Sequence, residues 1–343
     1  MKIGILTHPL AFNYGGILQC YALSTYLRTK GNDVVVIQRK PDRPFFVKRW
    51  IIKSLEAAHI PRFYKKNKLD KARNTLLFVS KNINLTKPID NQPGIRGLCK
   101  EYDIDAVIVG SDQVWRADYA MQFGYNYFLD FVPNNVKKIA YAASFGLSEW
   151  KYSPEQTEKI RRCLKSFNAI SVREEEAVSL CKENLGVDVI QMPDPTMLLS
   201  ASDYGKLASK RLLDENYVFI YWLGEKKHVE KNIADYESKG YRVKYVGLRQ
   251  QEVLPSVEDW LSYIKNADIV LTDSFHGCVF SLLFGKELHV FANDSGGNGR
   301  IKSLFRLVGA DGDVIKPNDC SHFSSVLRSI QDEAEVFINN SLK

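Results

Sequence analysis

The run from Thr272 to Gly277 carries the polar residues best suited to chemistry, because it follows an apolar strand and opens an apolar helix. His276 would lie in the first turn of that helix, where the dipole disfavours an imidazolium by about 0.3–1 kcal/mol but favours an anion. Histidine is also the side chain best suited to proton transfer near neutral pH. We predict that His276 transfers a proton beside a bound anion, with Asp273 orienting its ring and Ser274 and Gly277 nearby. A capped helix with an incidental histidine is the alternative.

Three further turns end apolar strands in small or polar residues. In the run 13–16 two glycines let the backbone approach a ligand at a helix N-terminus, although the spacing lacks the G-x-G-x-x-G pattern of dinucleotide sites. The run 110–115 ends in an aromatic ring that could stack on a sugar, and the third turn spans residues 144–146. Serine and aspartate are also the commonest helix caps, so capping and tight turns explain the same residues. The ligand-binding candidates from these turns are Asn13, Gly15, Gly16, Ser111, Asp112, Trp115 and Ser144.

Two arginines complete this group of candidates. Arg173 closes the strand AISVRE, and Arg300 opens a helix after the glycine-rich run 293–299. A guanidinium binds phosphate or carboxylate through two parallel hydrogen bonds. The turn at 193–196 could line the same cleft or serve only as a rigid loop. Together these residues predict a site for a small phosphate-bearing anion.

Short strand patterns alternate with helical patterns along nearly the whole chain, which is typical of parallel sheets with crossover helices. The 343 residues exceed the usual size of one core. We therefore predict an α/β protein of two Rossmann-like, doubly wound domains, with the boundary after residue 166 and the second domain spanning 167–318. The last helix, over 319–343, is expected to pack back on the first domain. Ligands of such sheets bind beyond the carboxyl ends of the strands, so the site is expected in the interdomain cleft.

Composition narrows the class of protein. The six cysteines are scattered without paired spacing, which argues against a disulfide framework or a zinc knuckle. The histidines, aspartates and cysteines do not have the spacing of metal ligands, so we predict no required metal. No uninterrupted apolar run is long enough for a membrane span, and the N-terminus does not resemble a signal peptide. A cytoplasmic location is expected.

Positive charge is concentrated between residues 39 and 81, which hold 13 Lys or Arg and three acids. Aromatic and aliphatic residues are interleaved with these cations. This pattern predicts peripheral contact with the anionic inner face of a membrane, or else a solvated helical insertion that covers the first domain. No nucleic-acid-binding signature accompanies the charge, so nucleic acid is not an expected partner.

In their order along the chain, the segments NYGG, GSDQVW, YAASFG, the S-x-R-E turn at 171–174, PDPT, TDSFHG and NGRI resemble the polysaccharide pyruvyl transferase family. The resemblance implies a glycosyltransferase-B-like fold, with the acceptor on the first domain and the donor on the second. It also implies transfer of pyruvate from phosphoenolpyruvate to a sugar of a cell-surface glycan or lipid-linked oligosaccharide, as a ketal with release of phosphate. No cofactor is implied beyond this donor substrate.

By position in these motifs, His276 matches the family's proposed general acid and Arg173 matches an arginine expected to bind the donor. One departure concerns Ser274, which stands where many members carry an arginine. Either Arg300 takes over that role, or this branch uses a different donor or acceptor. Two other functions stay open: a nucleotide-sugar-dependent glycosyltransferase of the same architecture, and a glycan-binding protein without activity.

Overall fold

The computed structural model describes residues 1–42, 66–292, 298–309, 312–317 and 320–343. Most of the basic segment, residues 43–65, lies outside the described residues, and so does the glycine-rich run 293–297. Membrane contact through that segment stays a prediction. None of the helices in the described part of the chain is long and apolar enough to cross a membrane.

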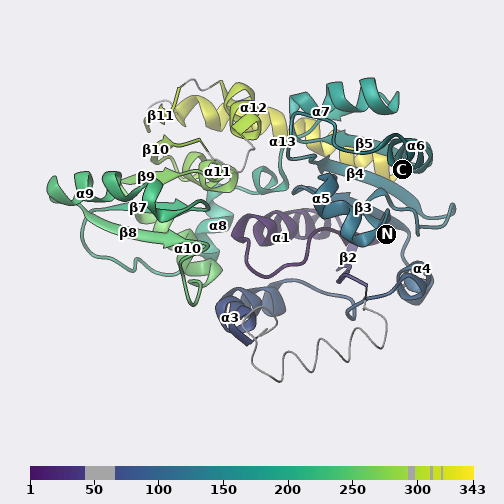
Figure 1. Ribbon diagram of the computed structural model, residues 1–343, viewed down its shortest axis with the longest axis horizontal. Coiled ribbons are helices and arrows are strands. Elements are labelled where there is room, and N and C mark those ends of the chain that lie inside the picture. The colour runs from purple at the N-terminus through teal and green to yellow at the C-terminus, as the bar shows by residue number, and fades with distance from the viewer. Residues whose placement is uncertain (43–65, 293–297, 310–311, 318–319) are drawn as a thin grey trace.

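The first half of the chain forms a six-stranded parallel sheet in the order β2-β1-β3-β4-β5-β6 (Figure 1). The chain starts in the interior of this sheet and builds outward in both directions, which is the doubly wound arrangement. Its central strands are buried on both faces, as their continuous apolar sequences predict. The strands are β1 (Lys2–Leu6), β2 (Asp33–Val36), β3 (Ala106–Gly110), β4 (Lys137–Ala143), β5 (Ala169–Val172) and β6 (Ile190–Gln191).

The second sheet has five strands in the order β11-β10-β9-β7-β8, and only the β10–β11 pair is antiparallel. With the first sheet it gives two Rossmann-like domains, which confirms the predicted fold class. The strands are β7 (Tyr217–Trp222), β8 (Arg242–Gly247), β9 (Ile269–Thr272), β10 (Glu287–Val290) and β11 (Val314–Ile315).

Helices cover both sheets, as the crossover pattern requires (Figure 1). Local signals set several of their ends: at α6, for example, Ser153 and Gln156 form a reciprocal capping box and Pro154 occupies the first turn. The helices are α1 (Tyr14–Thr29), α3 (Lys66–Asn82), α4 (Gln92–Glu101), α5 (Ala117–Ala120), α6 (Pro154–Leu164), α7 (Glu175–Leu180), α8 (Ala201–Leu207), α9 (Glu230–Ser238), α10 (Val257–Asn266), α11 (Phe275–Leu283), α12 (Asn298–Val308) and α13 (Cys320–Leu342).

The chain passes between the sheets later than the boundary predicted after residue 166. Strands β5 and β6 extend the first sheet, with Ala169 paired to Ile139 of β4, so the crossing lies between residues 191 and 217. A strand's sequence does not reveal its partner, and this pairing places residues 169–191 in the first domain. Helix α13 then returns to that domain, where Phe337 contacts the ring of Tyr141.

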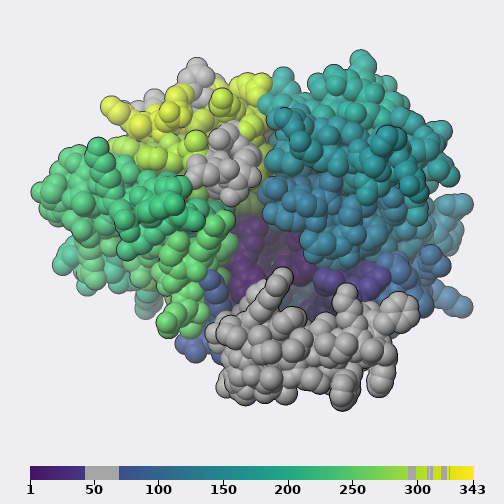
Figure 2. Space-filling model, in the orientation of Figure 1, coloured from purple at the N-terminus to yellow at the C-terminus, as the bar shows by residue number. Residues whose placement is uncertain are grey.

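Helix α1 joins the two domains. The ring of Tyr14 stacks on Trp260 of α10, with 5.1 Å between ring centroids, and its hydroxyl donates to the carbonyl oxygen of Pro255 at 2.8 Å. One apolar cluster therefore runs from the first sheet into the second domain. Figure 2 shows a hollow between the two halves, with N-terminal residues in purple at its floor.

A bulge in β4 shapes the edge of the first sheet that faces this hollow. The register with β5 shifts between Ala140 and Ala143, and Ala142 adopts a left-handed φ of 49°. The Ser171 hydroxyl repairs the ladder, because it accepts from the Ala142 amide at 2.9 Å and donates to the Ala140 carbonyl at 3.1 Å. Bulges of this kind redirect the residues that follow them.

We predict that Ser171→Ala lowers the free energy of unfolding by about 1–3 kcal/mol, because it leaves the buried Ala142 amide unpaired. Urea unfolding measures this change. The control is Ser281→Ala, which removes an equally buried hydroxyl that donates only to the Gly277 carbonyl within α11. Equal losses in the two variants would contradict a special role for Ser171.

Candidate active site

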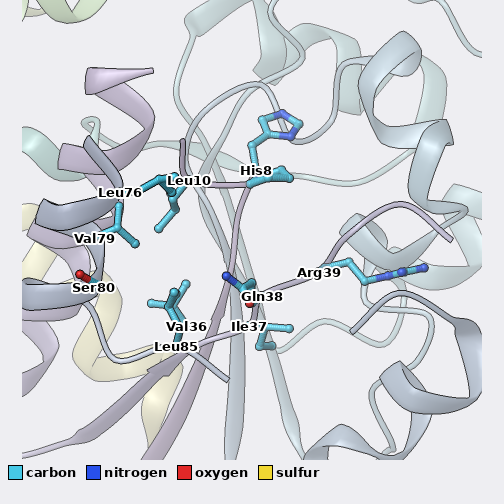
Figure 3. A pocket seen from close by; sticks show the side chains of 11 residues that line it. His8, Leu10, Val36, Ile37, Gln38, Arg39, Leu76, Val79, Ser80 and Leu85 are labelled. Atoms are coloured by element: carbon cyan, nitrogen blue, oxygen red, sulfur yellow. The ribbon is translucent and has the colours of Figure 1, made fainter. Parts of the chain in front are cut away.

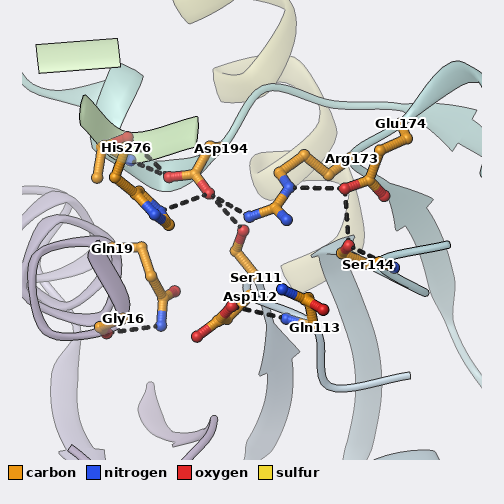
Figure 4. Close-up of polar contacts among 12 residues, drawn as sticks. Gly16, Gln19, Ser111, Asp112, Gln113, Ser144, Arg173, Glu174, Asp194 and His276 are labelled. Carbon is orange, nitrogen blue, oxygen red and sulfur yellow. Dashed lines mark hydrogen bonds and ion pairs between the residues drawn. The ribbon is translucent and has the colours of Figure 1, made fainter. Parts of the chain in front are cut away.

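The site is organised around Asp194, a fully buried carboxylate at the start of the short 3-10 helix η4 (Pro195–Leu198) between the two sheets (Figure 4). Its Oδ2 atom accepts from the Ser111 hydroxyl at 2.8 Å and from Nη1 of Arg173 at 2.9 Å. The same oxygen lies 3.5 Å from Nε2 of His276. Groups from the ends of β3, β5 and β9 thus meet at one oxygen atom.

The second oxygen of Asp194 is held by its own turn, since Oδ1 accepts from the amide and the hydroxyl of Thr196 at 3.0 and 2.7 Å. Burial by itself would raise the pKa of this carboxyl. The positive charges of His276 and Arg173 and the Thr196 amide together hold its pKa well below the usual range. Asp194 is therefore a fixed negative charge.

Arg173 is also almost fully buried and lies between two carboxylates. Its Nε atom donates to Glu174 at 3.0 Å, and the Ser144 hydroxyl donates to the same Glu174 oxygen at 2.7 Å. The guanidinium lies 4.5 Å from the ring centroid of Phe275, a residue of the second domain. Its Nη2 atom is buried and has no hydrogen-bond partner among the described residues.

His276 lies in the first turn of α11, as the sequence predicts. Ser274 caps this helix by accepting from the Gly277 amide at 3.3 Å. The imidazole packs against α1 where Gly15 has no side chain, since a Cβ atom there would lie 2.0 Å from Nδ1 of His276. Within the described chain Nε2 has no hydrogen-bond partner, because its 3.5 Å contact with Asp194 is an ion pair without hydrogen-bond geometry.

Asp273 does not orient His276 in the way the sequence suggested. Its carboxylate accepts from the backbone amides of Leu223 and Gly224 at 2.7 and 2.9 Å, and so holds the loop after β7. The carboxylate in ion-pair contact with His276 is Asp194, which precedes it by 82 positions in the chain.

Trp115 is not a platform for a sugar ring. Its side chain is fully buried, stacks on Phe128 with 5.6 Å between ring centroids, and donates from Nε1 to the carbonyl of Tyr127 at 2.9 Å. The polar start of this turn directs Ser111 and Asp112 to the site, while its aromatic end belongs to the core of the first domain.

Asp112 and the start of α1 form the floor of the site. Asn13 makes no side-chain cap to α1; its amide instead donates to Oδ2 of Asp112 at 3.5 Å. A Cβ atom at Gly16 would lie 3.1 Å from that same oxygen. The two glycines thus let the helix N-terminus approach His276 and Asp112 closely.

Arg300 lies in the first turn of α12. Its Nε atom is buried and has no hydrogen-bond partner in the part of the chain that the structure describes. Burial, followed by the neighbouring charge of Arg173, lowers the pKa of the Arg300 guanidinium to about 10. The charges of two neighbouring guanidinium groups repel one another away from water, and an anion bound between them offsets this repulsion. No group of three or more potential metal ligands occurs within the described residues.

The sequence model of the polysaccharide pyruvyl transferase family matches residues 13–295, which include Arg173, Asp194 and His276. The chain belongs to this family. Among curated protein sequences, none matches the chain significantly.

Two solved structures support the fold of this pyruvyl transferase family member. The UDP-GlcNAc 2-epimerase from Methanocaldococcus jannaschii is 12% identical with a TM-score of 0.51, over 96% of this chain and 92% of that one. The UDP-GlcNAc 2-epimerase from Neisseria meningitidis bound to UDP-GlcNAc is 12% identical with a TM-score of 0.50, over 99% of each chain. This likeness confirms the glycosyltransferase-B-like arrangement and concerns the fold alone.

The structure brings some of the predicted residues together at the polar site and uses others to cap a helix. The residues at the polar site are His276, Arg173, Ser111, Ser144 and Asp112. By contrast, Ser274 and Gly277 form the N-terminal cap of α11. Local sequence did not single out Asp194, which was predicted only as part of the turn at 193–196. Its signal was the P-D-P-T turn itself, because an aspartate held by the following threonine has a fixed orientation.

We predict that Gly15→Ala destabilises the protein by about 1–3 kcal/mol, because the added methyl group overlaps the imidazole of His276. The control is Gly97→Ala in α4, where an added Cβ meets no atom within 4 Å. That change should stabilise the protein by about 0.4–1 kcal/mol. Urea unfolding of both variants measures the difference, and a stabilised Gly15→Ala would show that the ring does not occupy this space.

Proposed function

We propose that this protein transfers pyruvate from phosphoenolpyruvate to two hydroxyls of a glycan sugar, forming a ketal and releasing phosphate. The observation that carries the proposal is a pair of buried nitrogen atoms, Nη2 of Arg173 and Nε of Arg300, that lack hydrogen-bond partners among the described residues. Buried donors are normally paired, so donors of this kind favour an anionic ligand. Phosphoenolpyruvate carries two anionic groups, a phosphate and a carboxylate.

The two arginines would bind these anionic groups. Arg173 is held rigidly by Asp194 and Glu174, so its remaining Nη2 is preorganised for a ligand oxygen. Arg300 approaches from the second domain. Burial, and after it the charge of Arg173, lowers the pKa of Arg300, and an anion between the two guanidinium groups would offset both effects. The N-terminus of α1 adds a favourable dipole.

His276 would supply the proton that starts the transfer. Protonation of the methylene carbon of phosphoenolpyruvate leaves an oxocarbenium-like centre at the carbon that bears the phosphate and the carboxylate. One sugar hydroxyl adds to this carbon, and a second hydroxyl adds as the bond to phosphate breaks. Asp194, whose Oδ2 atom lies 3.5 Å from Nε2 of His276, would hold the ring in place for this step.

The acceptor is assigned from family membership alone. The Ser111 and Ser144 hydroxyls already donate to Asp194 and Glu174, so they position the site, and Trp115 is buried. Asn13, a predicted ligand-binding residue, is exposed and donates to Asp112, so its side chain would be accessible to an acceptor.

Incubation with phosphoenolpyruvate and a panel of synthetic and lipid-linked glycans tests the function. We expect phosphate release and an acceptor mass gain equal to pyruvate minus water. His276→Ala should lower turnover by about 10²- to 10⁴-fold with little change in donor affinity, as for a lost general acid. Release of a nucleotide from a sugar nucleotide would favour a glycosyltransferase instead, and glycan binding without turnover would favour a protein without activity.

We also predict that Arg300→Ala weakens phosphoenolpyruvate binding by about 10- to 150-fold, as expected for one lost charge-assisted hydrogen bond. Arg300→Lys should restore only part of this affinity, because an ammonium cannot form the two-pronged contact. Isothermal titration measures both. The control is Lys302→Ala, which removes an exposed cation from the same helix. If Arg300→Ala binds the donor as tightly as the parent, Arg300 does not replace the arginine absent at Ser274.

A further inference from the structure

His8 is a polar residue of the first domain to which the mechanism above gives no role. It follows the end of β1, and in the β1–β3 ladder Leu6 is paired with Val109. Continuing this register places His8 level with Ser111, beside Asp112. The topology thus brings His8 to the edge of the sheet that carries the site.

The imidazole of His8 is held between aromatic rings. Its centroid lies 5.2 Å from that of Tyr127 and 5.7 Å from that of Tyr119, and both contacts are edge-to-face. Tyr127 is fully buried, and its hydroxyl donates to the carbonyl of Thr7 at 3.4 Å. Nε2 of His8 is buried and has no hydrogen-bond partner among the residues that the structure describes.

The neighbouring cavity does not satisfy this nitrogen. His8 itself lines this cavity, which has a volume of about 280 Å³. The rest of the lining is mainly apolar and includes Leu10, Leu76 and Val79, with Gln38, Arg39 and Ser80 as the other polar side chains. In Figure 3 the ring of His8 extends away from these leucine and valine side chains.

Asp112 links His8 to the rest of the site. Its carboxylate is buried and accepts from the Gln113 amide at 2.8 Å, and a left-handed φ of 55° fixes the turn. Burial alone would raise its pKa, but the charges of His8 and then His276 lower it. A single ionised carboxylate thus interacts with both histidines.

The aromatic environment of His8 also includes a cation. The guanidinium of Arg116 lies 4.8 Å from the ring centroid of Tyr119, which contacts His8. Arg116 is also one of the charges that lower the pKa of Arg300. Tyr119 thus contacts both His8 and Arg116, a cation whose charge acts on Arg300.

We propose that His8 is the base that removes the proton from the first acceptor hydroxyl, an inference that rests on the proposed function. His276 gives a proton to the methylene carbon of phosphoenolpyruvate while the first hydroxyl oxygen bonds to the adjacent carbon and passes its proton to Nε2 of His8. The second hydroxyl oxygen then bonds to the same carbon, the bond to phosphate breaks with its electron pair, and phosphate takes the second hydroxyl proton.

The protons lost and gained by the two histidines are equal in number. His276 has lost one proton and His8 has gained one, so a single proton transfer between them restores both residues. The charges of both histidines act on the Asp112 carboxylate and lower its pKa. The carboxylate is a positioning residue in this scheme, and the histidines touch the substrates.

The experiment compares the parent with His8→Ala, using phosphoenolpyruvate and p-nitrophenyl hexosides that have free hydroxyl pairs. We expect phosphate release and ketal formation to fall by about 10²- to 10⁴-fold, while the dissociation constant for phosphoenolpyruvate stays within about threefold of the parent. Added imidazole should restore part of the rate, because the deleted side chain leaves room for a free base. An unchanged donor affinity shows that the variant is folded.

The control is His289→Gln in β10, whose ring contacts Glu287 and Tyr236 in the second domain and which should retain the parent rate. A His8→Ala variant with the parent rate would overturn the assignment. So would a loss of rate that imidazole does not restore, since that result indicates a structural role. If the parent releases no phosphate either with these acceptors or with the synthetic and lipid-linked glycans above, the proposed function fails, and this inference fails with it.

Discussion

The buried carboxylate of Asp194 is the interaction on which the site depends. It lies on the connection between the sheets, and it receives Ser111 and Arg173 from the first domain and His276 from the second. A carboxylate removed from water is tolerated only where such partners surround it, and removing one member of a buried pair typically costs about 3–5 kcal/mol. Docking of the two domains and assembly of the site are therefore one event.

Helix α1 makes that docking specific. Its first turn carries an aromatic side chain that packs into the second domain, followed by two residues with no side chain at all. Tyr14 packs against α10, while Gly15 leaves the space that the imidazole of His276 fills. Apolar packing and the polar site thus share one helical turn, and neither can shift without the other. This coupling explains why a short glycine-containing turn is important in so large a chain.

Much of this protein is determined by local sequence. The alternation of strand and helix patterns predicts two doubly wound domains, because each strand and each crossover helix carries its own periodicity. The strand-to-helix turns predict where ligands bind, since the carboxyl ends of parallel strands share one edge. His276 and Arg173 could be identified as candidates for the same reason. The ordered motifs additionally indicated the family.

Tertiary structure decided which of these groups meet. Sequence proximity favoured Asp273 as the partner of His276, but the loop after β7 uses that carboxylate, and Asp194 comes from a distant turn. The tertiary structure also buries Trp115 in the core and places β5 and β6 in the first sheet. The physical reason is common to these cases. A residue's type and local period show that it must be buried or paired, but the partner is set by strand order and domain docking, which depend on contacts far apart in the chain.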